Sequence, residues 1–361
     1  MNKILKVGII GCGGIARQKH FPALIALGQK CEMVAFCDII EQRAVDAKKD
    51  FGSQQARAYT DYRDLLADES IDVVHVLTPN VSHAPIAVDA FAAGKHVMCE
   101  KPMAPTAAMA ATMIAAWKKS GKKFTVGYQN RFNPMLQSLQ ATCRDGELGD
   151  IYFAKAHAVR RRAVPTWGVF QDKAQQGGGP LIDIGTHALD LTLWCMNNYE
   201  PHSVSGSWFH KMAEATDGNM FGPWDPTTFD VEDSAFGLIK MKNGATIFLE
   251  ASWILNITRP KEIATTLCGT KAGAEADLIR GELVYNRARN GLLTEESLSA
   301  KGSIAYFEGG NSNPGIIEAR QWLDAILEDQ EPLVRPEQAF VVTNILDAIY
   351  QSAQSGKEYF F

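Results

Sequence analysis

Near its amino terminus the chain reads Gly11-Cys12-Gly13-Gly14-Ile15-Ala16, directly after an apolar run over residues 4–10. This is the pattern G-x-G-x-x-G/A between a predicted strand and a predicted helix. The first glycine makes a tight turn, the second lets the backbone approach a pyrophosphate, and Ala16 keeps helix and strand close. Free N–H groups at the start of the helix then face the phosphates. The stretch predicts a dinucleotide site at Gly11, Gly13, Gly14 and Ile15, although glycine-rich turns also occur as packing devices.

Short apolar runs alternate with helical patterns over the first third of the chain. The predicted strands cover residues 4–10, 33–37, 73–77, 96–99 and 124–128. Amphipathic or alanine-rich segments between them predict helices at residues 15–27, 41–50, 85–93 and 106–120. This βαβ repetition predicts an α/β fold with an N-terminal Rossmann domain over residues 1–128, a doubly wound parallel sheet with helices on both faces.

The pattern changes in the rest of the chain. After a predicted helix at residues 134–144, further strands are predicted at residues 151–162, 204–211, 234–241, 245–253 and 262–267. Asn243-Gly244 is a two-residue hairpin signal, so we expect residues 129–361 to form a C-terminal α+β domain with a large, mainly antiparallel open sheet. Because such a sheet tends to be covered by another subunit, we expect a homodimer or homotetramer formed through it.

Composition is that of an ordinary globular protein, with 46% hydrophobic and 21% charged residues. A net charge of -5 without a Lys/Arg-rich block argues against binding to nucleic acid or to an anionic membrane. The seven cysteines show no C-x-x-C spacing, so we expect a reducing compartment, without disulfides or structural zinc. No run approaches the roughly 18 apolar residues of a membrane helix. We therefore expect a cytoplasmic protein with a small-molecule ligand.

Two further features fit a dinucleotide site. Asp38 ends the second predicted strand, where a carboxylate would accept hydrogen bonds from the adenosine ribose and repel a 2′-phosphate, which favours NAD over NADP. Arg43 argues the other way, because it could accommodate that phosphate, so NADP stays open. Thr78, Pro79 and Asn80 follow the strand predicted at residues 73–77 and reach the carboxyl edge of the sheet, where ligands bind in such folds.

Glu100, Lys101 and Pro102 follow the strand predicted at residues 96–99 and reach the same edge. A lysine there can hydrogen-bond a substrate hydroxyl and take part in proton transfer. By itself, however, a Lys-Pro pair is more often only a turn.

A second segment with candidate catalytic side chains reads Gly177-Gly178-Gly179-Pro180-Leu181-Ile182-Asp183-Ile184-Gly185-Thr186-His187. Three glycines permit a close backbone approach, Pro180 is suited to open a helix, and Asp183 and His187 then lie one turn apart on one face. A carboxylate and an imidazole in this arrangement can act as general acid and general base. The alternatives are a core histidine and a helix-capping aspartate. A metal site that includes Asp190 fits poorly, because Asp190 lies off that face, and we expect no metal.

These motifs occur in the order found in one known family. From Lys6 to about Tyr350 the chain resembles the Gfo/Idh/MocA oxidoreductases, which include glucose-fructose oxidoreductase and inositol dehydrogenase. The resemblance implies an NAD(P)-binding Rossmann domain and, over residues 129–361, a domain that supplies the substrate pocket and the oligomer contacts. It implies that Lys101, Asp183 and His187 are catalytic and that Glu100 and Lys101 also lie at the cofactor. His83 resembles a family position near the cofactor, although it could equally cap the following helix.

The implied activity is hydride transfer between NAD, or NADP, and a hydroxyl or keto carbon of a sugar, sugar derivative or cyclitol. His187 would take the hydroxyl proton, Lys101 would stabilise the charge that develops on that oxygen, and Asp183 would orient the substrate or share the proton. Two alternatives stay open. Some relatives are glycosidases that keep NAD bound and act by transient oxidation and elimination, and a non-catalytic nucleotide-binding sensor has the same fold. The sensor is disfavoured, because a protein that only binds has no need for all three residues.

Five further residues are candidates for substrate contact. By analogy with the family, the loop that contains Arg162, Trp167 and Lys173 closes over cofactor and substrate. Trp167 could pack on a sugar face or shield the nicotinamide from water. Tyr128 and Asn130 end the last strand of the first domain and could reach the active site. The arginines around residue 162 could instead be a partly solvated strand end.

Overall fold

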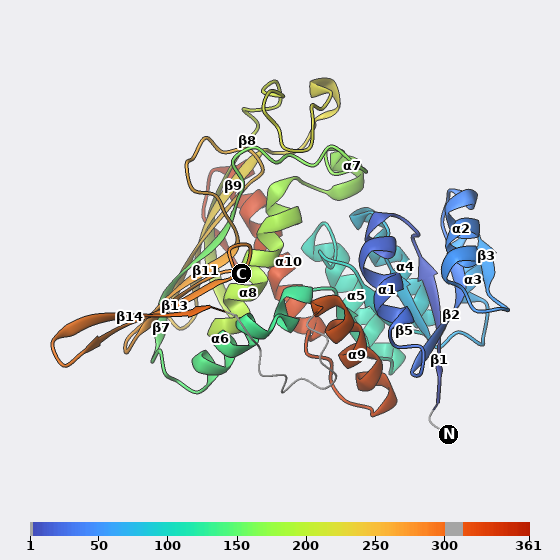
Figure 1. Cartoon of the computed structure of the whole chain (residues 1–361). Coiled ribbons are helices and arrows are strands. Elements are labelled where there is room, and N and C mark those ends of the chain that lie inside the picture. Colours follow the sequence, from blue (N-terminus) through green and yellow to red (C-terminus); the bar gives the residue numbers. More distant parts are fainter. Residues whose placement is uncertain (1–2, 300–312) are drawn as a thin grey trace. The chain divides into compact units, whose positions relative to one another are not determined.

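The computed structural model describes residues 3–299 and 313–361, which form two compact units (Figure 1). One unit contains residues 3–132 and 313–340, and the other contains residues 133–299 and 341–361. We expected a single boundary after residue 128, but the segment 313–340 returns to the first unit. The division into a cofactor domain and a substrate and oligomer domain at that boundary stays a prediction.

The first unit is built on a parallel six-stranded sheet with the order β3-β2-β1-β4-β5-β6. Its strands are β1 (Leu5–Ile10), β2 (Cys31–Cys37), β3 (Arg57–Tyr59), β4 (Val73–Val76), β5 (His96–Cys99) and β6 (Phe124–Val126). This is the strand order of a doubly wound dinucleotide-binding fold, so the predicted fold class is confirmed. The edge strand β3 was not predicted, because three residues without full burial carry little sequence signal.

Helical segments connect and flank these strands. They are η1 (Ala16–His20), α1 (Phe21–Ile25), α2 (Glu41–Phe51), α3 (Tyr62–Leu66), η2 (Asn80–Ser82), α4 (His83–Ala92), α5 (Ala107–Ser120), η3 (Gln129–Phe132) and α9 (Pro314–Leu327). Three of these helices have a polar N-cap residue. The side chains of Asp61, Thr106 and Asn313 accept hydrogen bonds from backbone N–H groups at the starts of α3, α5 and α9. The helix predicted at residues 15–27 contains a π-helical turn, η1.

Helix α9 explains why residues 313–340 belong to the first unit. Its Trp322 and Leu323 are buried in one apolar cluster with Leu24 of α1 and Val7 of β1. Burying a side chain of this size contributes on the order of 2 kcal/mol, so the chain gains stability by returning to this core after the second unit.

The second unit is built on a nine-stranded sheet with the order β14-β13-β12-β11-β7-β10-β9-β8-β15. Its strands are β7 (Ile151–Val159), β8 (Pro201–Phe209), β9 (Ser234–Met241), β10 (Thr246–Ser252), β11 (Lys261–Gly269), β12 (Gly273–Asp277), β13 (Glu282–Arg289), β14 (Leu292–Ser299) and β15 (Tyr359–Phe360). Strands β7 and β10 pair in parallel, and the other described pairs are antiparallel. The predicted hairpin at Asn243-Gly244 joins β9 to β10, and Gly244 takes the left-handed backbone conformation that the turn needs.

Helices α6 and α8 lie on one face of this sheet (Figure 1). The helical segments of the unit are α6 (Pro134–Arg144), α7 (Lys173–Gln176), η4 (Leu181–Gly185), α8 (Thr186–Met196), η5 (Pro226–Thr228) and most of α10 (Pro336–Ser355). On β7, Ala154, Ala156 and Ala158 are fully buried on one face, and α8 packs across β7 and β11. The small alanines let α8 approach the sheet closely, which holds the segment leading into it in place.

In the described ranges, no helix combines the length and apolar character that crossing a membrane requires.

Candidate active site

In the glycine turn after β1, one glycine is required by the fold and two leave space for a ligand. Gly11 has a φ of +97°, and a Cβ there would lie 2.6 Å from the carbonyl oxygen of Leu77, so only glycine fits. At Gly13 and Gly14, by contrast, a Cβ would meet no described atom within 4 Å. The open space over these two glycines fits the close approach of a pyrophosphate to the backbone.

Asp38 holds the same turn from the end of β2. Its Oδ2 accepts the backbone N–H of Cys12 at 2.9 Å, and its Oδ1 accepts the N–H of Ile40 at 2.9 Å. A carboxylate oxygen can accept more than one hydrogen bond, so these contacts leave capacity for ribose hydroxyls. Asp38 thus has a structural role that the sequence did not reveal, since it holds the backbone of the glycine turn, and this role is compatible with the predicted ribose contact.

His83 joins the turns that follow β4 and β5. Its Nδ1 lies 2.9 Å from the carbonyl oxygen of Pro102, and its Nε2 lies 2.9 Å from that of Thr78. The ring is fully buried, and burial lowers its pKa, so the imidazole is neutral and donates its single N–H to one of the two carbonyls. Helix α4 begins without a side-chain cap. His83 therefore braces the loop that contains Thr78, Pro79 and Asn80.

Lys101 follows a buried carboxylate. The Oε2 of Glu100 accepts the backbone N–H of Lys101 at 3.0 Å, and its Oε1 accepts from Lys19 Nζ at 2.7 Å and from His20 Nε2 at 2.8 Å. Burial alone would raise the pKa of Glu100, but the Lys19 charge and the His20 hydrogen bond outweigh it and hold that pKa well below its usual range. The carboxylate is engaged by protein groups, and its predicted contact with the cofactor stays a prediction.

In the second unit, Asp183 and His187 share the accessible face of an otherwise buried segment. From residue 178 to residue 195 every other residue is buried, and these two are partly exposed. Asp183 lies inside the π-helical turn η4, and α8 begins after Gly185 without a side-chain cap, so Asp183 does not cap that helix. Turns of this kind are frequent at functional sites.

Trp253, at the end of β10, is a site residue that sequence reasoning missed. Its indole Nε1 donates a hydrogen bond to Asp183 Oδ2 at 3.0 Å, and its side chain is fully buried. A rigid buried donor fixes where the Asp183 carboxylate points. No motif in the sequence connects residues 70 positions apart, so nothing could have signalled this pair.

The glycine run before Asp183 has a packing role. A Cβ at Gly178 would lie 2.1 Å from the hydroxyl oxygen of Tyr350, and one at Gly179 would lie 2.1 Å from the carbonyl oxygen of Glu232. The Glu232 carboxylate accepts the N–H groups of Gly179 and Leu181 and the Tyr350 hydroxyl, at 2.8, 3.1 and 2.8 Å. We expected these glycines to let another group come close to the backbone. At Gly178 and Gly179 that group is a protein residue, Tyr350 or Glu232.

The predicted substrate residues lie in both units. Trp167 is 52% exposed and packs edge-on against Phe221, with ring centroids 4.8 Å apart. Arg162 donates to the Ala215 carbonyl and to Asn256, and Lys173 begins α7. Tyr128 and Asn130, in the first unit, are buried. Across residues 3–299 and 313–361, no three His, Cys, Asp or Glu residues are grouped so that they could hold a metal ion.

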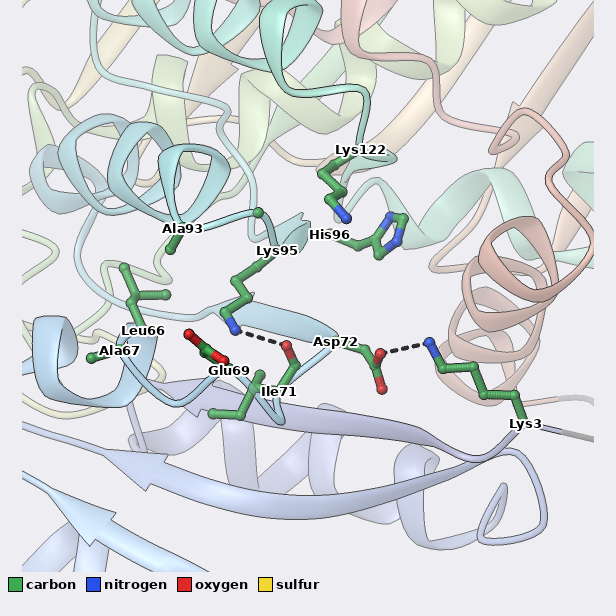
Figure 2. A pocket seen from close by; sticks show the side chains of 11 residues that line it. Lys3, Leu66, Ala67, Glu69, Ile71, Asp72, Ala93, Lys95, His96 and Lys122 are labelled. Atoms are coloured by element: carbon green, nitrogen blue, oxygen red, sulfur yellow. Dashed lines mark hydrogen bonds and ion pairs between the residues drawn. The ribbon is translucent and has the colours of Figure 1, made fainter.

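A separate hollow lies at the opposite edge of the six-stranded sheet (Figure 2). Lys3, Asp72 and Lys95, which precede β1, β4 and β5, line it. Lys95 Nζ donates to the carbonyl oxygen of Ile71, and Lys3 Nζ pairs with Asp72. These cations tie strand starts together, and ligands of open parallel sheets bind at the carboxyl edge instead.

Comparison with known proteins identifies the family. Residues 5–128 match an oxidoreductase family with an NAD-binding Rossmann fold, GFO_IDH_MocA, and residues 136–275 match the GFO/IDH/MocA C-terminal domain. The chain belongs to the GFO/IDH/MocA family. It is therefore an NAD-binding oxidoreductase, which confirms the predicted family, enzyme class and cofactor.

The chain is similar to several known proteins in sequence or in fold. D-glucoside 3-dehydrogenase of Escherichia coli is 34% identical over 352 residues, covering 98% of this chain and 96% of the relative. Inositol 2-dehydrogenase of Salmonella typhimurium is 33% identical over 194 residues, covering 54% of this chain and 55% of the relative. Among solved structures, GenD2 from gentamicin A biosynthesis in complex with NAD has a TM-score of 0.78 at 26% identity, covering 100% and 97% of the two chains. Levoglucosan dehydrogenase in complex with NADH and levoglucosan shares the fold, with a TM-score of 0.84 at 23% identity over 99% of each chain.

Proposed function

We propose that this oxidoreductase transfers hydride between NAD and a hydroxyl or keto carbon of a sugar, sugar derivative or cyclitol. The observation that carries the proposal is the shared accessible face of Asp183 and His187 in an otherwise buried segment. The relatives named for a D-glucoside and for inositol support carbohydrates and cyclitols as the substrate class.

The proposal assigns proton and charge chemistry to three residues. NAD, when bound, supplies the nicotinamide that accepts or donates the hydride. His187 takes the proton of the reacting hydroxyl in oxidation and returns it in reduction. Lys101 donates a hydrogen bond to the same oxygen and stabilises its developing negative charge. Asp183, held by Trp253, orients the substrate hydroxyls or shares the proton.

The cofactor contacts are assigned to the first unit. The backbone of Gly11, Gly13, Gly14 and Ile15 would hold the pyrophosphate, Asp38 the ribose, and Thr78, Pro79, Asn80, His83, Glu100 and Lys101 would lie around the rest of the cofactor. The carboxylate of Asp38 favours NAD over NADP. Measured kcat/KM for both cofactors tests this choice, and a higher value with NADP would show that Asp38 has been misassigned. The variant Asp38→Asn, without the repelling charge, should narrow the preference for NAD.

Substrate recognition is assigned to Trp167, Arg162 and Lys173, with Tyr128 and Asn130 contributing from the first unit. The exposed ring of Trp167, braced by Phe221, is suited to pack against the apolar face of a sugar ring. Replacement by Trp167→Ala should raise KM for the carbohydrate more than KM for NAD. An unchanged carbohydrate KM would remove Trp167 from the substrate site.

The decisive experiment is an absorbance screen for NADH formation with aldoses, glycosides, inositols, sugar acids and amino sugars. Lys101→Ala and His187→Ala should each lower kcat by about 100-fold or more while NADH still binds, because Lys101 stabilises the charge on the reacting oxygen and His187 takes its proton. Lys119→Ala, at an exposed position on α5, is the matched control and should keep full turnover. Full turnover in both active-site variants would refute the assignment. Sugar release from glycosides without net NADH would instead identify a glycosidase that acts by transient oxidation.

We also propose a homodimer or homotetramer formed through the uncovered face of the nine-stranded sheet. Leu238 of β9 is 40% exposed and lies opposite Phe248 of β10, so large apolar side chains meet on this face. Size-exclusion chromatography with light scattering should give two or four copies, and Leu238→Arg should reduce that number. A monomeric wild type would contradict the assembly.

A cytoplasmic location is proposed on the cysteines, all seven of which are free thiols. Cell fractionation tests it, and recovery with secreted or membrane fractions would count against it.

A further inference from the structure

A network of buried charged and polar side chains lies behind the turn that carries Lys101. Lys19 and His20 contribute from η1, His75 from β4, Glu100 from the end of β5 and Glu318 from α9, all in the first unit. Lys19 Nζ contacts Glu100 Oε1 at 2.7 Å and Glu318 Oε2 at 2.8 Å. His20 Nε2 lies 2.8 Å from Glu100 Oε1, and its Nδ1 lies 3.1 Å from His75 Nδ1. The network connects four elements that are separated in sequence.

The protons of this network can be assigned from its geometry. Because a carboxylate oxygen only accepts, His20 carries its hydrogen on Nε2 and donates to Glu100. Burial lowers the pKa of both His20 and His75, so both rings are neutral, and His20 Nδ1 accepts from His75 Nδ1–H. Hydrogen bonds therefore run from His75 to His20 and from His20 to Glu100. The other His75 nitrogen is buried and has no hydrogen-bond partner among the described residues.

The two carboxylates differ in charge. Lys19 and His20 both stabilise Glu100 as the anion. Burial raises the pKa of Glu318 to about 7, since the attraction of Lys19 is offset by desolvation and by the charge of Glu100. Glu318 contacts Lys19 through its Oε2. Glu100 is thus the permanent anion of the pair, and its second oxygen, Oε2, receives the backbone N–H of Lys101.

The space for this arrangement depends on Gly127, which follows β6. A Cβ at that position would lie 3.1 Å from the carboxyl atoms of Glu100. The carboxylate is therefore enclosed on this side by backbone and cannot shift far without losing one of its three donors.

We propose that Glu100 is a positioning residue that ties Lys101 to the helix of the glycine turn. Anchored to Lys19 and His20 on η1, its carboxylate holds the backbone from which Lys101 projects, so the turn after β1 and the turn after β5 keep a constant geometry. The inference rests on the proposed function, in which Lys101 contacts the reacting oxygen. Displacement of a reacting group by about 1 Å can cost on the order of 100-fold in rate, so a residue that prevents it controls kcat.

Glu100→Gln tests this role, with Glu318→Gln as the matched control. Glutamine supplies one acceptor oxygen, so its NH2 group must face either the Lys19 and His20 donors or the Lys101 N–H. In the protein without cofactor, hydrogen exchange at the Lys101 amide should speed up by about tenfold or more in Glu100→Gln and stay within about twofold of wild type in Glu318→Gln. The kcat should fall at least about tenfold in Glu100→Gln only. Unchanged amide exchange in Glu100→Gln, or an equal loss of kcat in Glu318→Gln, would overturn the proposal.

Lys19→Met keeps the inference testable if Glu100→Gln does not fold. Without the Lys19 cation, burial favours the protonated Glu100, which cannot accept from every donor that surrounds it. As the pH is lowered, the kcat of this variant should therefore begin to decline at a higher pH than the kcat of wild type, and it should recover when the pH is raised again. Superimposable profiles would contradict the role of Glu100. A wild type without dehydrogenase activity would refute the proposed function instead, and amide exchange at Lys101 would still test Glu100.

Discussion

Removal of the Glu318 carboxyl group should change how stability depends on pH. A glutamate side chain ordinarily titrates near 4.5, and burial raises the pKa of Glu318 to about 7. Between these two values the folded protein binds one proton more than the unfolded chain, so the free energy of unfolding falls as the pH rises. The stabilising contribution is fully present below about pH 4.5 and is lost by the time the pH has passed about 7.

The size of this loss follows from the two pKa values. Each pKa unit corresponds to about 1.4 kcal/mol, so the full loss is on the order of 3 kcal/mol, and most of it falls between about pH 5 and pH 8. In Glu318→Gln the side chain does not titrate. The fall in unfolding free energy from about pH 5 to about pH 8 should therefore be smaller in the variant than in wild type, by on the order of 2 to 3 kcal/mol.

Urea unfolding followed by tryptophan fluorescence at the two pH values measures the effect, since Trp322 lies one turn from Glu318 on α9. Glu69→Gln, at an exposed position in the same unit, controls for the loss of one carboxyl group and should match wild type. Equal pH dependence in wild type and Glu318→Gln would mean that Glu318 is ionised throughout this range. The partition of charge between Glu100 and Glu318 would then be wrong.

Three further substitutions have defined outcomes. Gly11→Ala should lower the free energy of unfolding by roughly 2 kcal/mol or more, seen as a lower Tm, because its Cβ would meet the Leu77 carbonyl at 2.6 Å in a left-handed backbone. Gly13→Ala should leave Tm unchanged, since its Cβ meets no described atom within 4 Å, yet weaken NADH binding about tenfold or more in a fluorescence titration. Equal NADH affinity would show that the cofactor does not approach Gly13. Trp253→Phe should lower kcat severalfold with NADH affinity retained, because the hydrogen bond to Asp183 is lost, and an unaltered kcat would make that bond purely structural.

Local patterns predicted most of the first unit. All five predicted strands there lie within two residues of an observed strand at both ends, and the glycine turn stands where G-x-G-x-x-A placed it. These features depend on backbone conformation and on the alternation of apolar segments, and both are properties of consecutive residues. The π-helical turns η1 and η4 were missed, because a one-residue change in helical hydrogen bonding leaves no periodic signal.

Part of the candidate site was predicted because its residues, too, lie close together along the chain. Asp183 and His187 are four residues apart, so one helical turn suffices to place them on one face. Trp253, which holds Asp183, and Glu232, which holds the glycine run, lie 70 and 53 residues away from their partners. Their roles depend on which strands of the nine-stranded sheet become neighbours.

The family, the dinucleotide turn and the pair of proton-transfer candidates could be predicted from the amino-acid sequence, because each depends on motifs of residues close together along the chain. Three other features became visible in the folded chain alone: α9 returns to the first unit, Glu318 and Glu100 share Lys19, and Gly178 and Gly179 pack against Tyr350 and Glu232. These outcomes depend on burial. An unpaired charge or an unfilled cavity in the protein interior lowers the stability of the fold. Segments that are distant in sequence therefore pack together where their charges pair and their side chains fill the space between them.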